Sequence, residues 1–414
     1  MQRAAHIARH MMESAPAAAA TTVERPKDWP EDIPVPIYHH SPRFAVGDPA
    51  SYKYFDDEGY VVYKDVLDAS EVQETLSKQW DFMEALGTGV DRHDPSTWDH
   101  QQWYPGGPGS GIMGNFGVGQ CDAMWYVRAK PKVKQVFAEL YGTHELLTSF
   151  DGMCLFRPTG LNPEWATNGN SWFHTDRSPY PDVDQRKYIQ GLVNIVKTTP
   201  EGGGNVIVRR SHKLYKELVE KYGQGEGERR SMDVQRVRKE RPEIFEDAIY
   251  THLEAGDVFL WDDRTLHCNA PGVGPAPATP ELLRSCCYVC MTPKSNATPE
   301  VIAGRRRAVE LGWGTGHTSH TQVQFLGRSP TVPAPLHLLT EDELRPTLKM
   351  MNPRMLGNDK LTLEQIDSMG KERMLEIIKN SEMWRRQGNS EQARYKCGAK
   401  PIESFTPEQL DLIG

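Results

Sequence analysis

The chain has 414 residues, of which 38% are hydrophobic and 25% charged, and this composition excludes fibrous and low-complexity proteins. No segment approaches the roughly 18 consecutive apolar residues of a membrane span, so we expect no membrane partner. The net charge of −8 argues against a nucleic-acid-binding surface and favours a small-molecule ligand. The oligomeric state is left open.

The seven cysteines are odd in number and have no regular spacing, which predicts free thiols in a reducing compartment. A cytoplasmic location is therefore expected. The segment Met1–Met12 has no acidic residue and carries Arg3 and Arg9. This composition is compatible with an organelle-targeting signal, so a mitochondrial or peroxisomal location is the alternative.

The N-terminal part predicts a tail followed by a few regular elements. Residues 1–45 offer few side chains to bury and are expected to be flexible. The segment 54–63 is predicted to be a turn leading into a short strand. Asp68 or Ser70 is expected to cap a helix with apolar residues at helical spacing. Residues 131–142 predict a second helix, with Pro131 in its first turn.

From residue 146 to 291 the pattern changes to short apolar runs separated by Gly, Pro, Asp and Asn, which favours a sandwich or jelly roll. The expected strands are 153–157, 188–197, 205–209, 257–261 and 282–291. Between them 213–222 and 231–240 are expected to be helical. After about 295 the chain predicts polar helices, including 342–350 and 362–381. The fold class is therefore mainly β with flanking helices (α+β).

The sequence Trp172-Phe173-His174-Thr175-Asp176 contains a pair of candidate metal ligands. In an extended backbone residues i and i+2 point to the same face, so His174 and Asp176 can bind one ion. Iron(II) oxygenases use two histidines and one carboxylate, so the third ligand has to come from elsewhere. The alternative is a hydrogen-bonded surface pair, because H-x-D is frequent by chance.

Two later residues add to this pair. The run Gly256 to Trp261 predicts a turn and a buried strand, and His267 follows it closely, at a position suited to face a cavity. Arg284 lies on the next apolar strand, where an unpaired cation would be costly. A dicarboxylate co-substrate would pair with it bidentately. The alternatives are a buried structural histidine and an arginine that pairs with an internal acid.

These residues, in this order, resemble the phytanoyl-CoA dioxygenase family of iron(II)/2-oxoglutarate-dependent oxygenases. The segment Glu201 to Lys213 also resembles a family element, a glycine-rich turn and strand followed by Gly-Ser-His-Lys, with Arg210 where glycine is usual. The resemblance covers roughly residues 50 to 295. It departs from the family in the longer interval between His267 and Arg284.

The resemblance implies a double-stranded β-helix (jelly-roll) core at residues 46–330, with a helical C-terminal extension at 331–414. It implies His174, Asp176 and His267 as iron ligands and Arg284 as the partner of 2-oxoglutarate. It also implies C–H hydroxylation of a small organic substrate, with iron(II), 2-oxoglutarate and O2 as cofactors and ascorbate as a candidate reductant. No catalytic residue is expected beyond the metal centre.

Further candidates surround this centre. Gln190 and Asn194 share one face of a predicted strand and are expected to face the cofactor cavity together with Asn269. Candidate substrate contacts are Arg157, Trp172, Arg177 and Tyr180. Each of these residues has packing or surface exposure as its alternative.

Three readings of the function stay open at this stage. They are the hydroxylation of a small molecule, the same iron core acting on a macromolecule or in desaturation or cyclisation, and a non-catalytic metal-binding jelly roll. Two features are set aside as unrelated to the site. His317 and His320 have metal-like spacing without a third partner nearby, and Arg305 to Arg307 is expected to be a solvated helix face.

Overall fold

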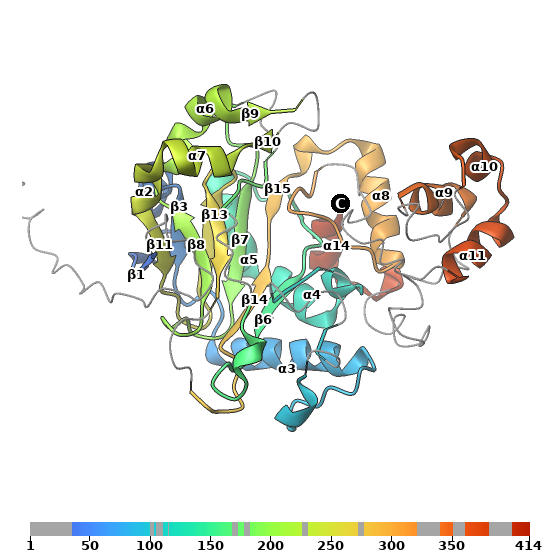
Figure 1. Ribbon diagram of the computed structural model, residues 1–414, viewed down its shortest axis with the longest axis horizontal. Helices are drawn as coiled ribbons and strands as arrows, with labels where there is room; N and C mark the ends of the chain where they lie inside the picture. The colour runs from blue at the N-terminus through green and yellow to red at the C-terminus, as the bar shows by residue number, and fades with distance from the viewer. Residues whose placement is uncertain are drawn as a thin grey trace, which may run out of the picture.

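The computed structural model describes residues 35–99, 103–104, 111–114, 116–167, 173–177, 183–225, 231–271, 277–320, 340–350, 361–380 and 400–414. Two β-sheets form the centre of this part of the molecule, and helices lie outside them (Figure 1). The architecture is therefore mixed α+β, as predicted. Within the described ranges, no helix is both long and apolar enough to span a bilayer.

The larger sheet has the strand order β2-β3-β12-β7-β14-β6-β4, and β15 pairs with both β5 and β7. Its strands are β2 (Arg43–Phe44), β3 (Tyr60–Tyr63), β4 (Ile112–Met113), β5 (Leu146–Thr148), β6 (Met153–Phe156), β7 (Ile189–Asn194), β12 (Val258–Asp262), β14 (Arg284–Tyr288) and β15 (Met291–Pro293). Every residue of β3, β6, β7, β12 and β14 is buried. Both faces of the sheet are covered, so these strands have continuous apolar runs instead of strict alternation.

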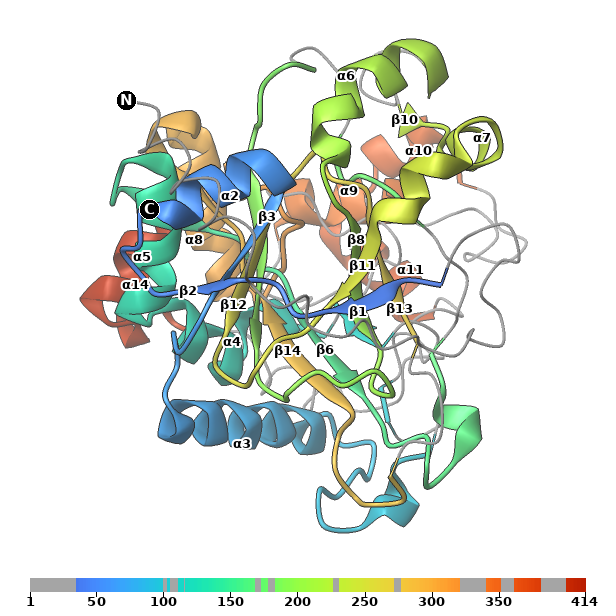
Figure 2. The same cartoon turned by 90° about the vertical axis from the view of Figure 1, so that its left-hand side faces the viewer.

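The smaller sheet has the order β1-β11-β8-β13. Its strands are β1 (Ile37–His39), β8 (Gly204–Val208), β11 (Ala248–Thr251) and β13 (His267–Ala270). Side chains from the two sheets pack into one buried cluster, with Ile207 and Ile249 from the smaller sheet and Leu192, Phe259 and Tyr288 from the larger. Figure 2 shows β8, β11 and β13 next to the strands of the larger sheet. The space between the sheets is therefore the inner core.

Helices cover the outer faces of both sheets. The helices on the larger sheet are α2 (Ala50–Glu58), α3 (Ala69–Ala85), α4 (Asp122–Arg128) and α5 (Pro131–Tyr141). The helices beside the smaller sheet are α6 (Ser211–Tyr222) and α7 (Val234–Glu240). The short strands β9 (Gly223–Gln224) and β10 (Ser231–Met232) lie between α6 and α7 in the chain. The C-terminal helices are α8 (Pro299–Glu310), α9 (Glu341–Met350), α10 (Leu363–Asp367), α11 (Lys371–Asn380) and α14 (Pro407–Ile413).

The helix caps agree with the sequence prediction. Asp68 caps α3 in a capping box with Glu71, because each side chain accepts a hydrogen bond from the other residue's backbone N–H. Pro131 begins α5, and Gly142 follows it with φ 69°, a left-handed conformation that glycine adopts at little cost. Strands at all the predicted positions are present, and α6 and α9 follow their predictions within about two residues.

Four predictions of local structure were wrong. Residues 50–58, expected in part as a turn, form α2. The helix predicted at 362–381 is divided into α10 and α11 at Gly370, where Glu341 accepts the N–H of Lys371. The run 282–291 is divided into β14 and β15 because its end leaves β6 and pairs with β5. Residues 37–39 and 43–44, placed in the tail, pair with β11 and β3, while residues 1–34 of that tail lie outside the described residues.

Arg305, expected on a solvated face, is completely buried in α8. Its guanidinium donates hydrogen bonds to the backbone carbonyls of Thr148, Ser319, Leu412 and Ile413, at 2.7 to 3.0 Å. Burial lowers the pKa of Arg305 to about 9, and the carbonyl oxygens compensate for the lost hydration. This side chain therefore joins β5, the segment after α8 and the C-terminal helix α14.

Candidate metal centre

His174, Asp176 and His267 lie together, although the sequence places the third far from the other two. His174 and His267 form an isolated antiparallel bridge, and each backbone N–H donates to the other's carbonyl at 3.0 Å. One ligand atom from each of the three side chains lies within 4.8 Å of the other two. The His174 Nε2 to Asp176 Oδ1 distance is 3.1 Å, and the His267 Nε2 to Asp176 Oδ2 distance is 3.3 Å.

The protonation of His267 suits a metal ligand. Its Nδ1 lies 2.9 Å from the carbonyl oxygen of Thr265, which can only accept, so the ring proton is on Nδ1 and Nε2 has a free lone pair. Burial lowers the pKa of His267, and the nearby His174 lowers it further, so the ring is neutral. The neutral tautomer thus presents Nε2 to the space beside Asp176.

Asp176 is the charged member of this cluster. Burial by itself would raise its pKa, but His317 and then His174 and His267 hold the pKa well below the usual range. Gln190 on β7 donates from Nε2 to Asp176 Oδ2 at 2.6 Å. The donor set is therefore two imidazole nitrogens and one carboxylate oxygen, which fits a divalent metal such as iron(II).

Arg284 at the start of β14 is buried on the inner side of the sheets. Its Nη1 donates to Asn269 Oδ1 at 3.0 Å, and its guanidinium lies over the Phe156 ring at 5.2 Å. Asn269 in turn donates to the Tyr288 hydroxyl at 3.3 Å. Within the part of the chain that the structure describes, Arg284 has no carboxylate partner in an ion pair. A buried cation without an anionic partner suits a site for an acidic ligand.

The glycine-rich segment at Gly202–Gly204 passes close to Arg284. Gly204 has φ 151°, and a Cβ there would lie 2.8 Å from the Tyr250 ring and 3.5 Å from Arg284 Nε. Arg210, which stands where the family has glycine, has φ 63° in the left-handed region, and its Nη2 pairs with Asp247 Oδ2 at 2.9 Å. The backbone conformation that favours glycine is thus kept at Arg210 at some conformational cost.

Two of the predicted contacts, Asn194 and Arg177, are engaged by other parts of the fold. Asn194 lies at the other end of β7, where its amide nitrogen donates to the backbone carbonyls of Val196 and Glu254. Arg177 is buried beside Tyr215, with Nη1 at 3.6 Å from Asp263 Oδ2, and contacts the Gln185 carbonyl. Both side chains hold loops through these contacts.

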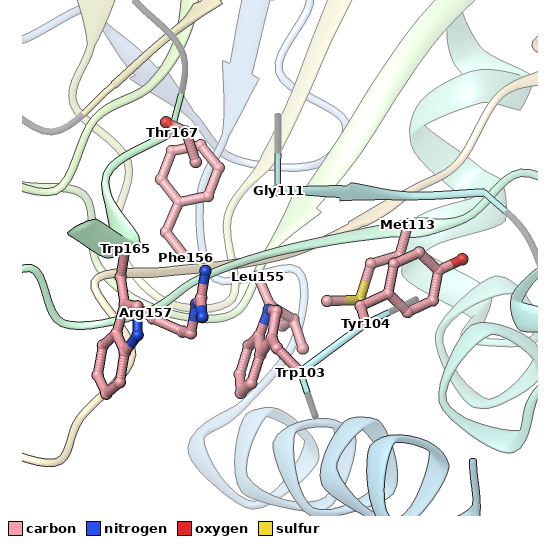
Figure 3. A pocket seen from close by; sticks show the side chains of 9 residues that line it. All are labelled: Trp103, Tyr104, Gly111, Met113, Leu155, Phe156, Arg157, Trp165 and Thr167. Atoms are coloured by element: carbon pink, nitrogen blue, oxygen red, sulfur yellow. The ribbon is translucent and has the colours of Figure 1, made fainter. Parts of the chain in front are cut away.

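The predicted substrate contacts Trp172 and Tyr180 lie outside the described residues. Arg157 lies in a pocket at the end of β6. The Arg157 guanidinium is 5.3 Å from the Trp103 ring and 5.2 Å from the Trp165 ring (Figure 3). Its Nη1 also donates to the Trp98 carbonyl at 2.7 Å. The pocket is lined by Trp103, Tyr104, Gly111, Met113, Leu155, Phe156, Arg157, Trp165 and Thr167.

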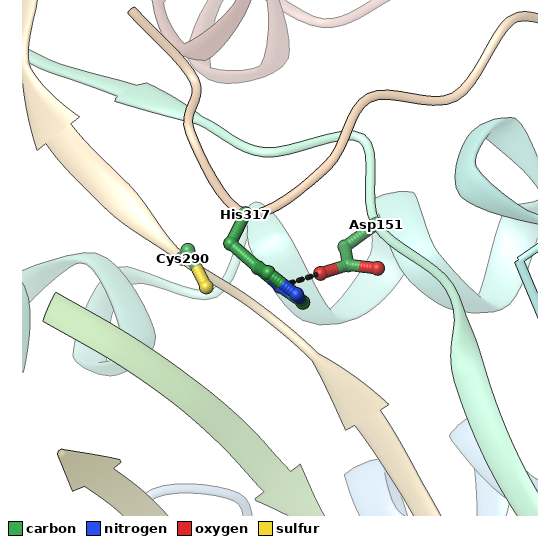
Figure 4. Close-up of side chains that lie close together, drawn as sticks. All are labelled: Asp151, Cys290 and His317. Atoms are coloured by element: carbon green, nitrogen blue, oxygen red, sulfur yellow. Dashed lines mark ion pairs between the residues drawn. The ribbon is translucent and has the colours of Figure 1, made fainter. Parts of the chain in front are cut away.

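His317, set aside in the sequence, reaches the metal cluster. Its Nε2 lies 3.2 Å from Asp176 Oδ2, and its Nδ1 lies 2.6 Å from Asp151 Oδ2. Figure 4 shows the ring of His317 between Asp151 and Cys290. A pair of histidines three residues apart predicts only partners close in the chain, whereas Asp151 and Asp176 come from much earlier segments. Its spacing to His320 carried no information about them.

Comparison with known proteins finds curated relatives of this chain. No protein-family model matches the chain. The chain is 27% identical over 277 residues to "Ava biosynthesis cluster protein O" of Aspergillus versicolor, an alignment that covers 65% of this chain and 85% of that protein. It is 25% identical over 198 residues to a "Putative phytanoyl-CoA dioxygenase" of Dictyostelium discoideum, covering 40% of this chain and 56% of that protein.

Solved structures with a similar chain path include two proteins that bind or depend on 2-oxoglutarate. The carbocyclase SnoK from nogalamycin biosynthesis is 14% identical, with a TM-score of 0.40, over 61% of this chain and 87% of that chain. EctD from S. alaskensis, with bound 2-oxoglutarate and 5-hydroxyectoine, is 16% identical, with a TM-score of 0.39, over 69% of this chain and 87% of that chain.

The chain is therefore similar to a curated putative phytanoyl-CoA dioxygenase, and the predicted resemblance to that family is confirmed.

Proposed function

We propose that this protein is an iron(II)/2-oxoglutarate-dependent dioxygenase with a jelly-roll core that hydroxylates a C–H bond of a small organic substrate. The observation that carries the proposal is the convergence of His174, Asp176 and His267, whose ligand atoms lie within 4.8 Å of one another. The buried Arg284 beside Asn269 supports it, because a dicarboxylate would supply the missing anionic partner.

In this proposal, His174, His267 and Asp176 hold iron(II), and Gln190 fixes the orientation of the Asp176 carboxylate through its 2.6 Å hydrogen bond. Arg284 and Asn269 bind the distal carboxylate of 2-oxoglutarate. Bound iron with 2-oxoglutarate and O2 supplies the oxidation, with decarboxylation of 2-oxoglutarate to succinate. The protein orients these groups, and the inner core between the two sheets excludes water.

The proposal is tested by anaerobic visible spectroscopy of the purified protein with iron(II), before and after the addition of 2-oxoglutarate. We expect a metal-to-ligand charge-transfer band that requires both additions. We also expect slow succinate release in air, with ascorbate present as reductant. Folded protein that shows no band with saturating iron and 2-oxoglutarate would contradict the proposal. A metal-binding protein without turnover would bind iron and release no succinate.

We further propose that the pocket at Arg157 receives part of the substrate. Phe156 belongs both to this pocket and to the surroundings of Arg284, so the pocket adjoins the proposed 2-oxoglutarate site. The indole Nε1 of Trp165 is buried and has no hydrogen-bond partner among the residues that the structure describes. Together with aromatic walls and a guanidinium, this favours a substrate that has an apolar or aromatic portion and a hydrogen-bond acceptor.

Replacing Arg157 with methionine keeps most of the packing between Trp103 and Trp165 and removes the charge. We expect the KM for the substrate to rise about tenfold, the effect of losing one charge-assisted hydrogen bond of roughly 1.5 kcal/mol. The KM for 2-oxoglutarate should change little. The measurement is steady-state kinetics with the first substrate found by a succinate-release screen, with exposed Arg236→Met on α7 as the control. An unchanged substrate KM would remove Arg157 from the substrate site.

A further inference from the structure

We propose that His317, held by Asp151, is a positioning residue of the metal centre: it donates from Nε2 to Asp176 Oδ2 and leaves Oδ1 to bind the metal. This inference rests on the proposed function for the identity of the metal. It concerns a residue from the segment after α8, which the sequence motifs do not assign to the site. Its structural basis has three parts.

The two oxygens of Asp176 have different surroundings. Oδ2 receives the Gln190 amide at 2.6 Å and lies 3.2 Å from His317 Nε2 and 3.3 Å from His267 Nε2, whereas Oδ1 lies 3.1 Å from His174 Nε2. A carboxylate whose one oxygen is engaged by two N–H donors has its other oxygen free as a ligand. Such an arrangement favours monodentate binding and keeps the remaining metal positions open for co-substrate and oxygen.

The ring of His317 is fixed from its opposite side. Asp151 Oδ2 lies 2.6 Å from Nδ1 in an ion pair, and Cys290 Sγ lies in the same cluster (Figure 4). With carboxylate oxygens at both nitrogens, the ring makes both contacts as hydrogen bonds only in its doubly protonated form.

The backbone around His317 is held on both sides. On one side Thr315 donates its N–H to the Phe150 carbonyl at 3.0 Å, and Phe150 donates its N–H to Thr315 Oγ1 at 2.7 Å. On the other side the Ser319 carbonyl accepts from buried Arg305 at 2.9 Å. The segment is therefore bound to the residue next to Asp151 and to the core of the C-terminal region, so the position of the ring is determined by the fold.

A role for His317 as a fourth ligand fits this geometry less well. His317 does not join the group in which the atoms of His174, Asp176 and His267 are all within 4.8 Å of one another. A fourth protein ligand would also remove one of the positions that 2-oxoglutarate and oxygen require. If His317 donates to the Asp176 carboxylate instead, all of these metal positions stay open.

The test is anaerobic titration of the full-length protein with cobalt(II), followed by the visible spectrum of the bound ion. We expect His317→Ala to weaken cobalt binding about 10- to 100-fold, the usual effect of removing a hydrogen-bond partner of a ligand, and to change the cobalt spectrum. His317→Gln keeps an N–H donor and should restore much of the affinity. His320→Gln, from the same segment and outside the cluster, is the control and should match the wild type.

Two results would overturn the inference. In one, His317→Ala binds cobalt with the affinity and spectrum of the His320→Gln control. In the other, His317→Ala loses cobalt as completely as His267→Ala, which would make His317 a ligand. If His317→Ala does not fold, as judged by thermal unfolding, His317→Gln decides. Cobalt binding that is weaker than in the wild type but not lost supports the inference, and loss as complete as in His267→Ala overturns it. The proposed function can fail separately. Wild-type protein that binds cobalt but shows no charge-transfer band with iron(II) and 2-oxoglutarate would contradict the proposed function and leave the His317 result intact.

Discussion

Replacing His267 with alanine is expected to abolish 2-oxoglutarate turnover and to weaken iron(II) binding by roughly a thousandfold or more. The loss should exceed the about 10- to 100-fold that removal of an outer hydrogen-bond partner typically costs. The reason is that His267 supplies a neutral Nε2 whose tautomer is fixed by the Thr265 carbonyl, and alanine has no such lone pair. His174→Ala should behave in the same way, because the two rings lie side by side with centroids 4.5 Å apart.

The measurement is anaerobic iron titration together with succinate release. His252→Gln is the matched control, because His252 is also a buried histidine but contacts Tyr38 and Glu254 in another part of the fold. That variant should bind iron like the wild type. If His267→Ala retained tight iron binding and full succinate release, the assignment of the metal centre would be wrong.

Replacing Arg284 with methionine is expected to raise the KM for 2-oxoglutarate roughly a hundredfold. Truncating one partner of a buried charge pair costs about 2–5 kcal/mol, and a hundredfold change corresponds to about 2.7 kcal/mol. Without the co-substrate, stability should change little, because the guanidinium has no carboxylate partner among the described residues and loses only the Asn269 hydrogen bond and its contact with the Phe156 ring. Arg284→Lys should be intermediate, because an ammonium group cannot bind a carboxylate through two parallel N–H donors.

Thermal unfolding with and without saturating 2-oxoglutarate checks this prediction. The wild type should be stabilised by the ligand, by about 2.7 kcal/mol at one hundred times its Kd, and Arg284→Met should lose most of that gain. Arg305→Met is the contrasting variant. Arg305 binds four backbone carbonyls in the core, so its loss should lower stability whether or not 2-oxoglutarate is present. Equal stabilisation of wild type and Arg284→Met would exclude Arg284 from the co-substrate site.

The sequence by itself determined the features that depend on local backbone geometry. The H-x-D pair could be predicted because residues two apart on an extended segment share a face, and both side chains lie in one cluster. The cap at Asp68 and the turn after Pro131–Tyr141 follow from side-chain hydrogen bonds and allowed φ angles near the helix ends. Arg284 was identified because a lone cation on an apolar strand requires a partner.

The tertiary structure decided which distant groups meet and which polar side chains are already engaged. Asn194 shares a strand face with Gln190, but turn carbonyls around Leu253 and Glu254 take its amide nitrogen. Arg305 is buried because the C-terminal helix α14 closes over it, and His317 reaches Asp176 because Phe150 and Thr315 bind their segments together. Such contacts depend on packing between segments far apart in the chain, which no local period or propensity encodes.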